Sequence, residues 1–370
     1  MVTPAYIVPV LACLLLHFGL GYRGEWQTYM WVFVCGEATV GLLHWAFYRQ
    51  RTSATEYLGS MVCSVHYEED WVELVTRIET RTDSRGRSYT VRKVDRIYHP
   101  EKYYYYTNIG SCYDTNSDFY SYIGELWGLP SRRDKWMGHD IEYGVRFGSH
   151  YTIEDFENGE AEDPYYCVPV TEAHRYKNKI RHSNSIFKYE KIDKERACDM
   201  GLIEYPPVDE LDTPCILSDD YDVPAEAQEM FQKFNVLHAA CCEMRLWVLL
   251  YRADRGVGVS EYQRAFWQGG HKNEFVVCIG VGTDGGVDWA RVFSWADDQT
   301  KEVETARWLM DNPQFEWLEF YNWLAGHIVG WRRKEFCDFD YINVSLPLWQ
   351  CLMISAVSVV ENALVIKMLL

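Results

Sequence analysis

The chain has 370 residues, of which 48% are hydrophobic and 16% aromatic, and its formal net charge is −18. This composition excludes intrinsic disorder, because a chain so rich in aromatic side chains can bury a sizeable core. The charge argues against nucleic acid as a ligand, since an acidic surface repels a phosphate backbone. The length leaves room for one large or two ordinary domains between hydrophobic ends.

Two apolar segments near the N-terminus, residues 2–20 and 30–48, predict a transmembrane helical hairpin over residues 1–50. The first segment has no formally charged side chain, and a helix of this length reaches about 28 Å, close to the thickness of a bilayer core. A cleaved signal peptide is the alternative, but no Lys or Arg precedes the apolar run and a second run follows at once. Glu37, in the second run beside Gly36, is expected at a contact between helices.

Basic residues near the ends of the apolar segments predict the orientation. The connection between the first two segments has only Arg23, whereas Arg49 and Arg51 follow the second segment and residues 332–334 are Arg-Arg-Lys. Because cytoplasmic loops carry an excess of Lys and Arg, the core is predicted to face the cytoplasm. Residues 346–370 predict a C-terminal transmembrane helix, with a buried or interfacial helix as the alternative.

Residues 51–207 are predicted to form a β-rich domain. Residues 71–82 alternate apolar and polar side chains, as in a half-buried strand, and residues 88–98 supply a second β-rich run. The sequence Asp-Ser-Arg-Gly between them favours a turn, so the two runs predict a long antiparallel hairpin. Residues 61–66 and 103–107 are predicted to extend the sheet.

A short helix is predicted over residues 118–127, opened by an aspartate cap and stopped by a Gly-Leu-Pro sequence. Residues 132–207 mix short aromatic strands with loops, and no role can be assigned to them. The pair Pro206 and Pro207 indicates a domain boundary near residue 208.

Residues 208–345 are predicted to form an α+β domain, in which one helix precedes three strands and two amphipathic helices follow. The helices are predicted over residues 225–242, 299–310 and 314–331, and the strands over residues 245–251, 275–281 and 287–295. This order suggests an α+β layer rather than alternating βαβ units. The fold class is therefore α+β, with transmembrane helices at both ends enclosing a β-rich and an α+β cytosolic core.

The loop over residues 268–274, which reads Gln-Gly-Gly-His-Lys-Asn-Glu and runs directly into a strand, is the densest group of candidate site residues. The glycine pair allows a ligand to approach the backbone closely, and His271, Lys272, Asn273 and Glu274 supply acid, base and hydrogen-bonding groups. These four are the candidate catalytic residues. The alternative is a polar loop that only turns the chain and caps the strand.

Together with Trp-Ala-Arg-Val-Phe-Ser-Trp at residues 289–295 and Arg-Lys-Glu-Phe at residues 333–336, this block resembles a group of uncharacterised membrane-anchored bacterial proteins. The resemblance covers the C-terminal third of the chain best, together with the two-span start, and it implies no activity. In that group Asn more often occupies the position of His271. The order of helix, strands and helices is also similar to the TPM fold, a membrane-tethered domain associated with phosphatase or chaperone-like roles.

His238 and Cys242 are the candidate metal ligands, because their i, i+4 spacing can place both side chains on one helix face. No second Cys/His pair has a matching spacing, so a structural cysteine is the preferred interpretation and no metal is predicted. No cofactor is predicted. The twelve cysteines are irregularly spaced and form no C-x-x-C, which favours a reducing compartment over a disulfide scaffold.

These observations predict a multi-pass protein of the cell membrane whose core domain faces the cytoplasm. The leading hypothesis is a membrane-tethered cytosolic binding or assembly module, since the sequence has no strong catalytic motif. Its predicted partners are the lipid bilayer and either a protein partner or a second copy of the chain, and not nucleic acid. The alternative is a membrane-tethered, TPM-like hydrolase with its site near residues 268–274. Transport through the spans is a third hypothesis and would require oligomerisation.

Overall fold

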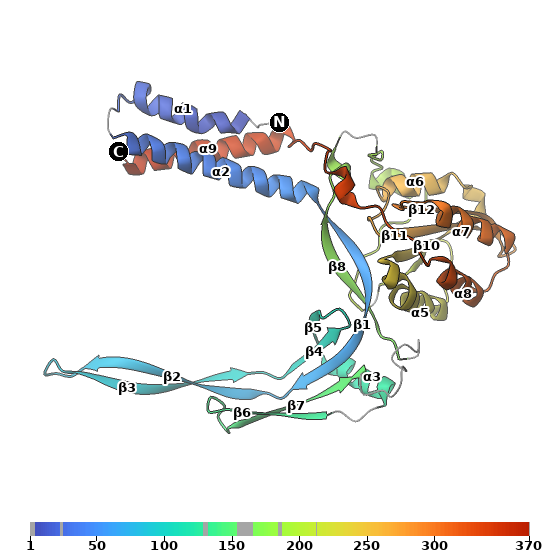
Figure 1. Cartoon of the computed structure of the whole chain (residues 1–370), viewed down its shortest axis with the longest axis horizontal. Helices are drawn as coiled ribbons and strands as arrows, with labels where there is room; N and C mark the ends of the chain where they lie inside the picture. The colour runs from blue at the N-terminus through green and yellow to red at the C-terminus, as the bar shows by residue number, and fades with distance from the viewer. Residues whose placement is uncertain are drawn as a thin grey trace.

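A computed structural model of the chain describes residues 4–22, 25–128, 132–153, 166–183, 187–211 and 213–369. Both ends of the chain contribute helices to one bundle, and the polar core lies beyond the end of that bundle (Figure 1). The core has two parts, a β-rich part with a long projecting hairpin and an α/β part. Arg23, on which the predicted orientation partly depends, lies outside the described residues.

Three helical segments lie side by side in the bundle (Figure 1). The first consists of η1 (Pro4–Ile7), α1 (Val8–Leu14) and η2 (Leu15–Gly19), and it is followed by α2 (Trp26–Thr52) and, at the other end of the chain, α9 (Leu348–Leu369). Val40 and Ile354 meet in one buried cluster, and Val32 and Ile366 in another, so α2 and α9 pack along much of their length.

Two of these helices, α2 and α9, are long and apolar enough to cross a membrane. The first segment is apolar as well, but its helix covers only Ala5–Gly19 and is shorter than the predicted span. The surface of the bundle is also rich in exposed apolar side chains. Examples that are each more than half exposed are Trp26, Leu42, Leu348 and Leu364.

The β-rich part is organised by one long strand, β1 (Ser53–Glu68), which continues directly from α2. Its sheet has the order β5-β4-β1-β7-β6, and β8 pairs with the first half of β1. The partners are β4 (Lys102–Thr107), β5 (Cys112–Thr115), β6 (Arg132–Met137), β7 (Val145–Thr152) and β8 (Pro169–Lys177). Helix α3 (Ser117–Trp127) covers one face and buries Ile123 against Val65 and Tyr105. Asn116 caps this helix by accepting a hydrogen bond from the Phe119 N–H.

The predicted hairpin is confirmed as a two-stranded arm of β2 (Trp71–Thr82) and β3 (Ser88–His99), paired over its whole length. It projects away from the rest of the molecule (Figure 1). The expectation that it is half-buried is wrong for its outer half, where Ile78 is 67% and Val94 54% exposed. No second layer of described residues packs there. At the base, the Arg146 guanidinium contacts the rings of both Trp71 and Trp136.

The α/β part contains a four-stranded sheet in the order β12-β11-β10-β9. Its strands are β9 (Ile216–Ser218), β10 (Arg245–Arg252), β11 (Glu274–Val281) and β12 (Val287–Ser294). The first three strands are parallel, and only β12 is antiparallel. Helix α5 (Ala225–Phe234) connects β9 to β10, and α6 (Val259–Phe266) connects β10 to β11. The expectation that βαβ units are absent is therefore wrong. The sequence did not reveal these units because β9 and α6 are too short to give a clear periodic pattern.

Each face of this sheet is covered by a separate hydrophobic cluster. Helices α5, α7 (Thr300–Asp311) and α8 (Trp317–His327) cover one face. Segment 192–205, which includes α4 (Lys194–Asp199), packs with α6 on the other face. The α/β part is therefore packed in part by residues that precede position 208, the predicted domain boundary. The other short helices among the described residues are η5 (Ile180–His182), η6 (Asn235–Ala239), η7 (Ala240–Cys242), η8 (Ala253–Arg255) and η9 (Phe336–Phe339).

Candidate functional site

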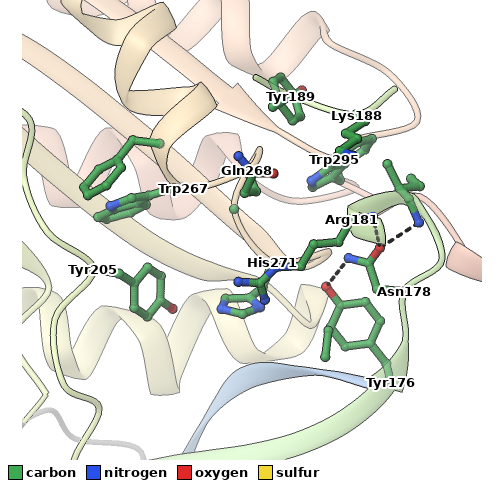
Figure 2. Close-up of a pocket in the computed structure, with 14 residues that line it drawn as sticks. Tyr176, Asn178, Arg181, Lys188, Tyr189, Tyr205, Trp267, Gln268, His271 and Trp295 are labelled. Atoms are coloured by element: carbon green, nitrogen blue, oxygen red, sulfur yellow. Dashed lines mark hydrogen bonds between the residues drawn. The ribbon is translucent and has the colours of Figure 1, made fainter. Parts of the chain in front are cut away.

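A cavity of about 280 Å³ lies where the β-rich part meets the α/β part (Figure 2). Tyr176, at the end of β8, and Tyr189, in the segment after it, contribute to the lining. Tyr205, Trp267 in the loop after α6, and Trp295 after β12 complete the aromatic lining. These rings give the cavity a largely aromatic lining, which suits a ligand with a flat or apolar part.

The polar groups at this cavity are cationic or neutral. Arg181, on η5, and Lys188 stand at its exposed mouth, and His271 lies deeper (Figure 2). No carboxylate lines the cavity, and neither Arg181 nor Lys188 has an ion-pair partner among the described residues. In a protein with a net charge of −18, this is a local excess of positive charge. It favours an anionic ligand.

The positive field extends towards the bundle. Burial lowers the pKa of His182 to about 4, and the nearby cations Arg51, Arg181 and Lys191 contribute to this shift. The imidazole of His182 is therefore neutral at pH 7, and the site's positive charge comes from arginine and lysine.

Two further features shape the inner wall. Among the described residues, the Trp295 Nε1 has no hydrogen-bond partner, and the atom is enclosed beside Gly269. Gln268, Gly269 and Gly270 all have positive φ angles, of 57°, 85° and 78°. A Cβ at Gly269 would lie 2.6 Å from Tyr189 and 2.9 Å from Trp295, so a residue without a side chain is required where the loop meets these rings.

Of the four candidate catalytic residues, His271 is the one that lines the cavity. Its ring makes edge contacts with Tyr57, at a centroid distance of 5.6 Å, and with Tyr205, at 5.3 Å. Lys272 points away into the junction between the two parts of the core. Its Nζ lies 3.2 Å from the Glu56 carboxylate, and its side chain is 11% exposed.

Asn273 and Glu274 are fully buried and have structural partners. Asn273 Nδ2 donates to the Tyr57 carbonyl at 2.7 Å, which ties the loop to β1. The Glu274 carboxylate accepts hydrogen bonds from Trp247 Nε1 at 3.0 Å, from the His271 N–H at 2.8 Å and from the Tyr205 hydroxyl. Burial and this carboxylate raise the pKa of Tyr205 well above its usual value. These contacts hold the loop in place.

The candidate metal ligands have separate partners. His238 Nε2 is 2.9 Å from the Tyr321 hydroxyl, and the Cys242 thiol lies 3.6 Å from the Ile328 carbonyl and 3.7 Å from the Cys241 sulfur. His238 lies in η6 and Cys242 in η7, so the regular α-helical spacing assumed for the pair is interrupted by a π turn and a 3-10 turn. The prediction that this pair holds no metal is not tested by these contacts.

Sequence reasoning missed Arg181, Lys188 and Tyr205, which are far from the 268–274 loop in the chain. A signal for two of them exists, because residues 175–191 carry a run of Arg, Lys and His with Glu190 as the only acid. In a chain this acidic, such a run is unusual and marks a basic surface.

Comparisons with protein families, with curated proteins and with solved structures found no match to this chain. The resemblances noted from the sequence therefore stay expectations, and functional inference depends on the geometry described above.

Proposed function

We propose that the chain is a membrane-anchored binding module whose cavity receives an anionic ligand with an aromatic or apolar part. The observation that carries this proposal is the cavity lining, in which Arg181 and Lys188 stand at the mouth of an aromatic pocket without a carboxylate. Two charged donors at the mouth of an aromatic pocket suit a phosphate, sulfate or carboxylate attached to a ring.

Anchoring is supported by the side chains where the bundle meets the core. A surface depression of about 350 Å³ at the junction of α2 and β8 is lined by Trp45, Tyr48, Arg49, Arg175 and Lys177. The Arg49 guanidinium lies 5.2 Å from the centre of the Trp45 ring. Aromatic and basic residues together are typical of the membrane–water interface, and basic residues favour its cytoplasmic side. On this proposal the bilayer is a partner and the core lies in the cytoplasm.

The cavity is close to this interface along the chain. Ala54, which lines the cavity, comes two residues after the end of α2, and Tyr176 lines both the cavity and the depression. A ligand bound at the cavity would therefore lie near the bilayer surface.

The arm offers a second surface, for a protein partner or another copy of the chain. Ile78, Val94 and Tyr98 lie on one face of the two-stranded ribbon by their register, and each is more than half exposed. Exposed apolar side chains on an extended ribbon favour contact with another protein.

Binding of p-nitrophenyl phosphate tests the ligand proposal. We expect the full-length protein in detergent to bind this probe more tightly than either p-nitrophenol or inorganic phosphate in equilibrium dialysis. Arg181→Gln is expected to weaken binding roughly 10- to 100-fold, because a hydrogen bond to a charged group contributes about 1.5–3 kcal/mol. Lys191→Gln is the control, since Lys191 is a nearby exposed cation that does not line the cavity. Equal affinities in both variants and the native protein would refute the proposal.

A membrane-tethered hydrolase is the second candidate, because His271 lines the same cavity as the two cations. The same probe separates the two functions. A binding module leaves p-nitrophenyl phosphate intact, whereas a hydrolase releases p-nitrophenol at a rate that His271→Gln reduces by roughly two orders of magnitude or more. Turnover that is lost in this variant would favour the hydrolase and would identify His271 as its acid or base.

A further inference from the structure

A second polar cluster lies on the β-rich sheet, away from the cavity. His66 on β1 is paired directly with His150 on β7, and His150 is paired with Arg132 on β6. Asp134 comes two residues after Arg132, so its side chain emerges on the same face of the sheet. Three neighbouring strands thus bring two imidazoles and one carboxylate together.

The donor atoms of His66, His150 and Asp134 all lie within 4.8 Å of one another. His150 Nδ1 is 2.5 Å from Asp134 Oδ2, which orients the imidazole. The His66 ring stacks on His150, at a centroid distance of 5.1 Å, and on Tyr104, at 5.0 Å with the two planes 2° apart. His66 Nε2 is also 2.9 Å from the Ser64 hydroxyl. These contacts fix the three side chains on a rigid sheet.

The side chains of this cluster are held in place and are still accessible to solvent. The side chains of His150 and Asp134 are 20% and 33% exposed, so a small ion can reach them from solvent while the sheet supports them from below. All three residues are partly buried, so the sheet holds their side chains in place.

We propose that His66, His150 and Asp134 bind one divalent transition-metal ion, with the remaining coordination positions open to solvent. Two imidazoles and a carboxylate are the donor set of zinc sites and of non-haem iron sites with exchangeable positions. The His150–Asp134 and His66–Ser64 hydrogen bonds are the kind that a bound ion would replace or reorient. This site is independent of the cavity and of its ligand.

Binding of Zn²⁺ and Co²⁺ to the full-length, chelator-treated protein in detergent tests the proposal. We expect one equivalent of Zn²⁺ by isothermal titration and a Co²⁺ absorption spectrum without a thiolate charge-transfer band. The spectrum separates this site from the exposed Cys241 and its neighbour Cys242. His150→Gln is expected to weaken this binding by more than roughly 100-fold, because even changes to outer partners of metal ligands cost about 10- to 100-fold.

His99→Gln is the matched control. His99 forms a 2.9 Å pair with Glu73 and stacks on Trp71, so it has the same carboxylate and aromatic contacts but no second imidazole. This variant is expected to bind the metal like the native protein. Should His150→Gln fail to fold, Asp134→Asn and the Co²⁺ spectrum of the native protein decide the question. Native-like affinity in both cluster variants, or a spectrum dominated by thiolate, would overturn the proposal.

Discussion

Replacing Glu56 with alanine is expected to destabilise the folded protein by about 3–5 kcal/mol, the cost of removing one partner of a buried ion pair. Glu56 lies on β1, and its side chain is 8% exposed. One of its oxygens is 3.2 Å from Lys272 Nζ and the other is 2.8 Å from Arg333 Nη1. Lys272 is 11% exposed and would be left largely buried without an ion-pair partner among the described residues. Arg333, which is 15% exposed, would keep its contacts with Glu243 and Glu335.

This prediction can be checked by urea unfolding of the full-length protein in detergent, followed by tryptophan fluorescence. Glu335→Ala is the control, because Glu335 also faces Arg333, at 3.9 Å, but is 60% exposed. Its loss is expected to cost less than about 1 kcal/mol, as for other surface pairs. If the two variants unfolded at the same urea concentration, Glu56 would not join the β-rich part to the α/β part.

Replacing Gly36 with leucine is expected to disrupt the helical bundle. A Cβ at Gly36 would lie 2.7 Å from Pro9 Cγ and 2.8 Å from Asn362 Nδ2, so α2 approaches both the first helical segment and α9 at this point. The neighbours are a proline ring and a buried amide, which have little room to move. Overpacking of this kind costs about 1–3 kcal/mol, and the four carbons of leucine place the expected cost near 3.

The unfolding temperature of the bundle in mild detergent measures this effect. Gly41→Leu is a matched control on the same helix, since the nearest atom to a Cβ there is the Tyr6 hydroxyl at 4.0 Å. We expect Gly41→Leu to unfold close to the native temperature and Gly36→Leu to unfold well below it. Equal temperatures would mean that the three segments do not pack as described.

Hydrophobic patterns within one continuous stretch of sequence predicted some helices and strands correctly. The arm followed from the alternation in residues 71–82 and from the turn after it, and α2 and α9 followed from long apolar runs. The same reasoning missed the parallel order of the α/β part. Strand β9 has three residues and α6 has eight, which is too short for periodicity to distinguish a crossover from a loop.

The sites were harder to predict because they depend on contacts between distant residues. His271 was identified from its own loop, but Arg181 and Tyr205 reach the same cavity from other segments. The His66, His150 and Asp134 cluster depends on strand register, which the sequence does not specify for these short aromatic strands. Lys272 and Glu274 have the residue types of a catalytic loop, yet their hydrogen bonds and ion pairs join parts of the fold.

We propose that the bundle anchors the protein and holds the core on the cytoplasmic side of a membrane. Labelling of Cys112, Cys198 and Cys337 tests it most directly, because these native thiols are exposed on different parts of the core. With a membrane-impermeant maleimide, we predict labelling only after the cells are permeabilised, in a protein that stays with the membrane after alkaline extraction. Labelling of the three thiols in intact cells, or release of the protein by alkali, would contradict the account.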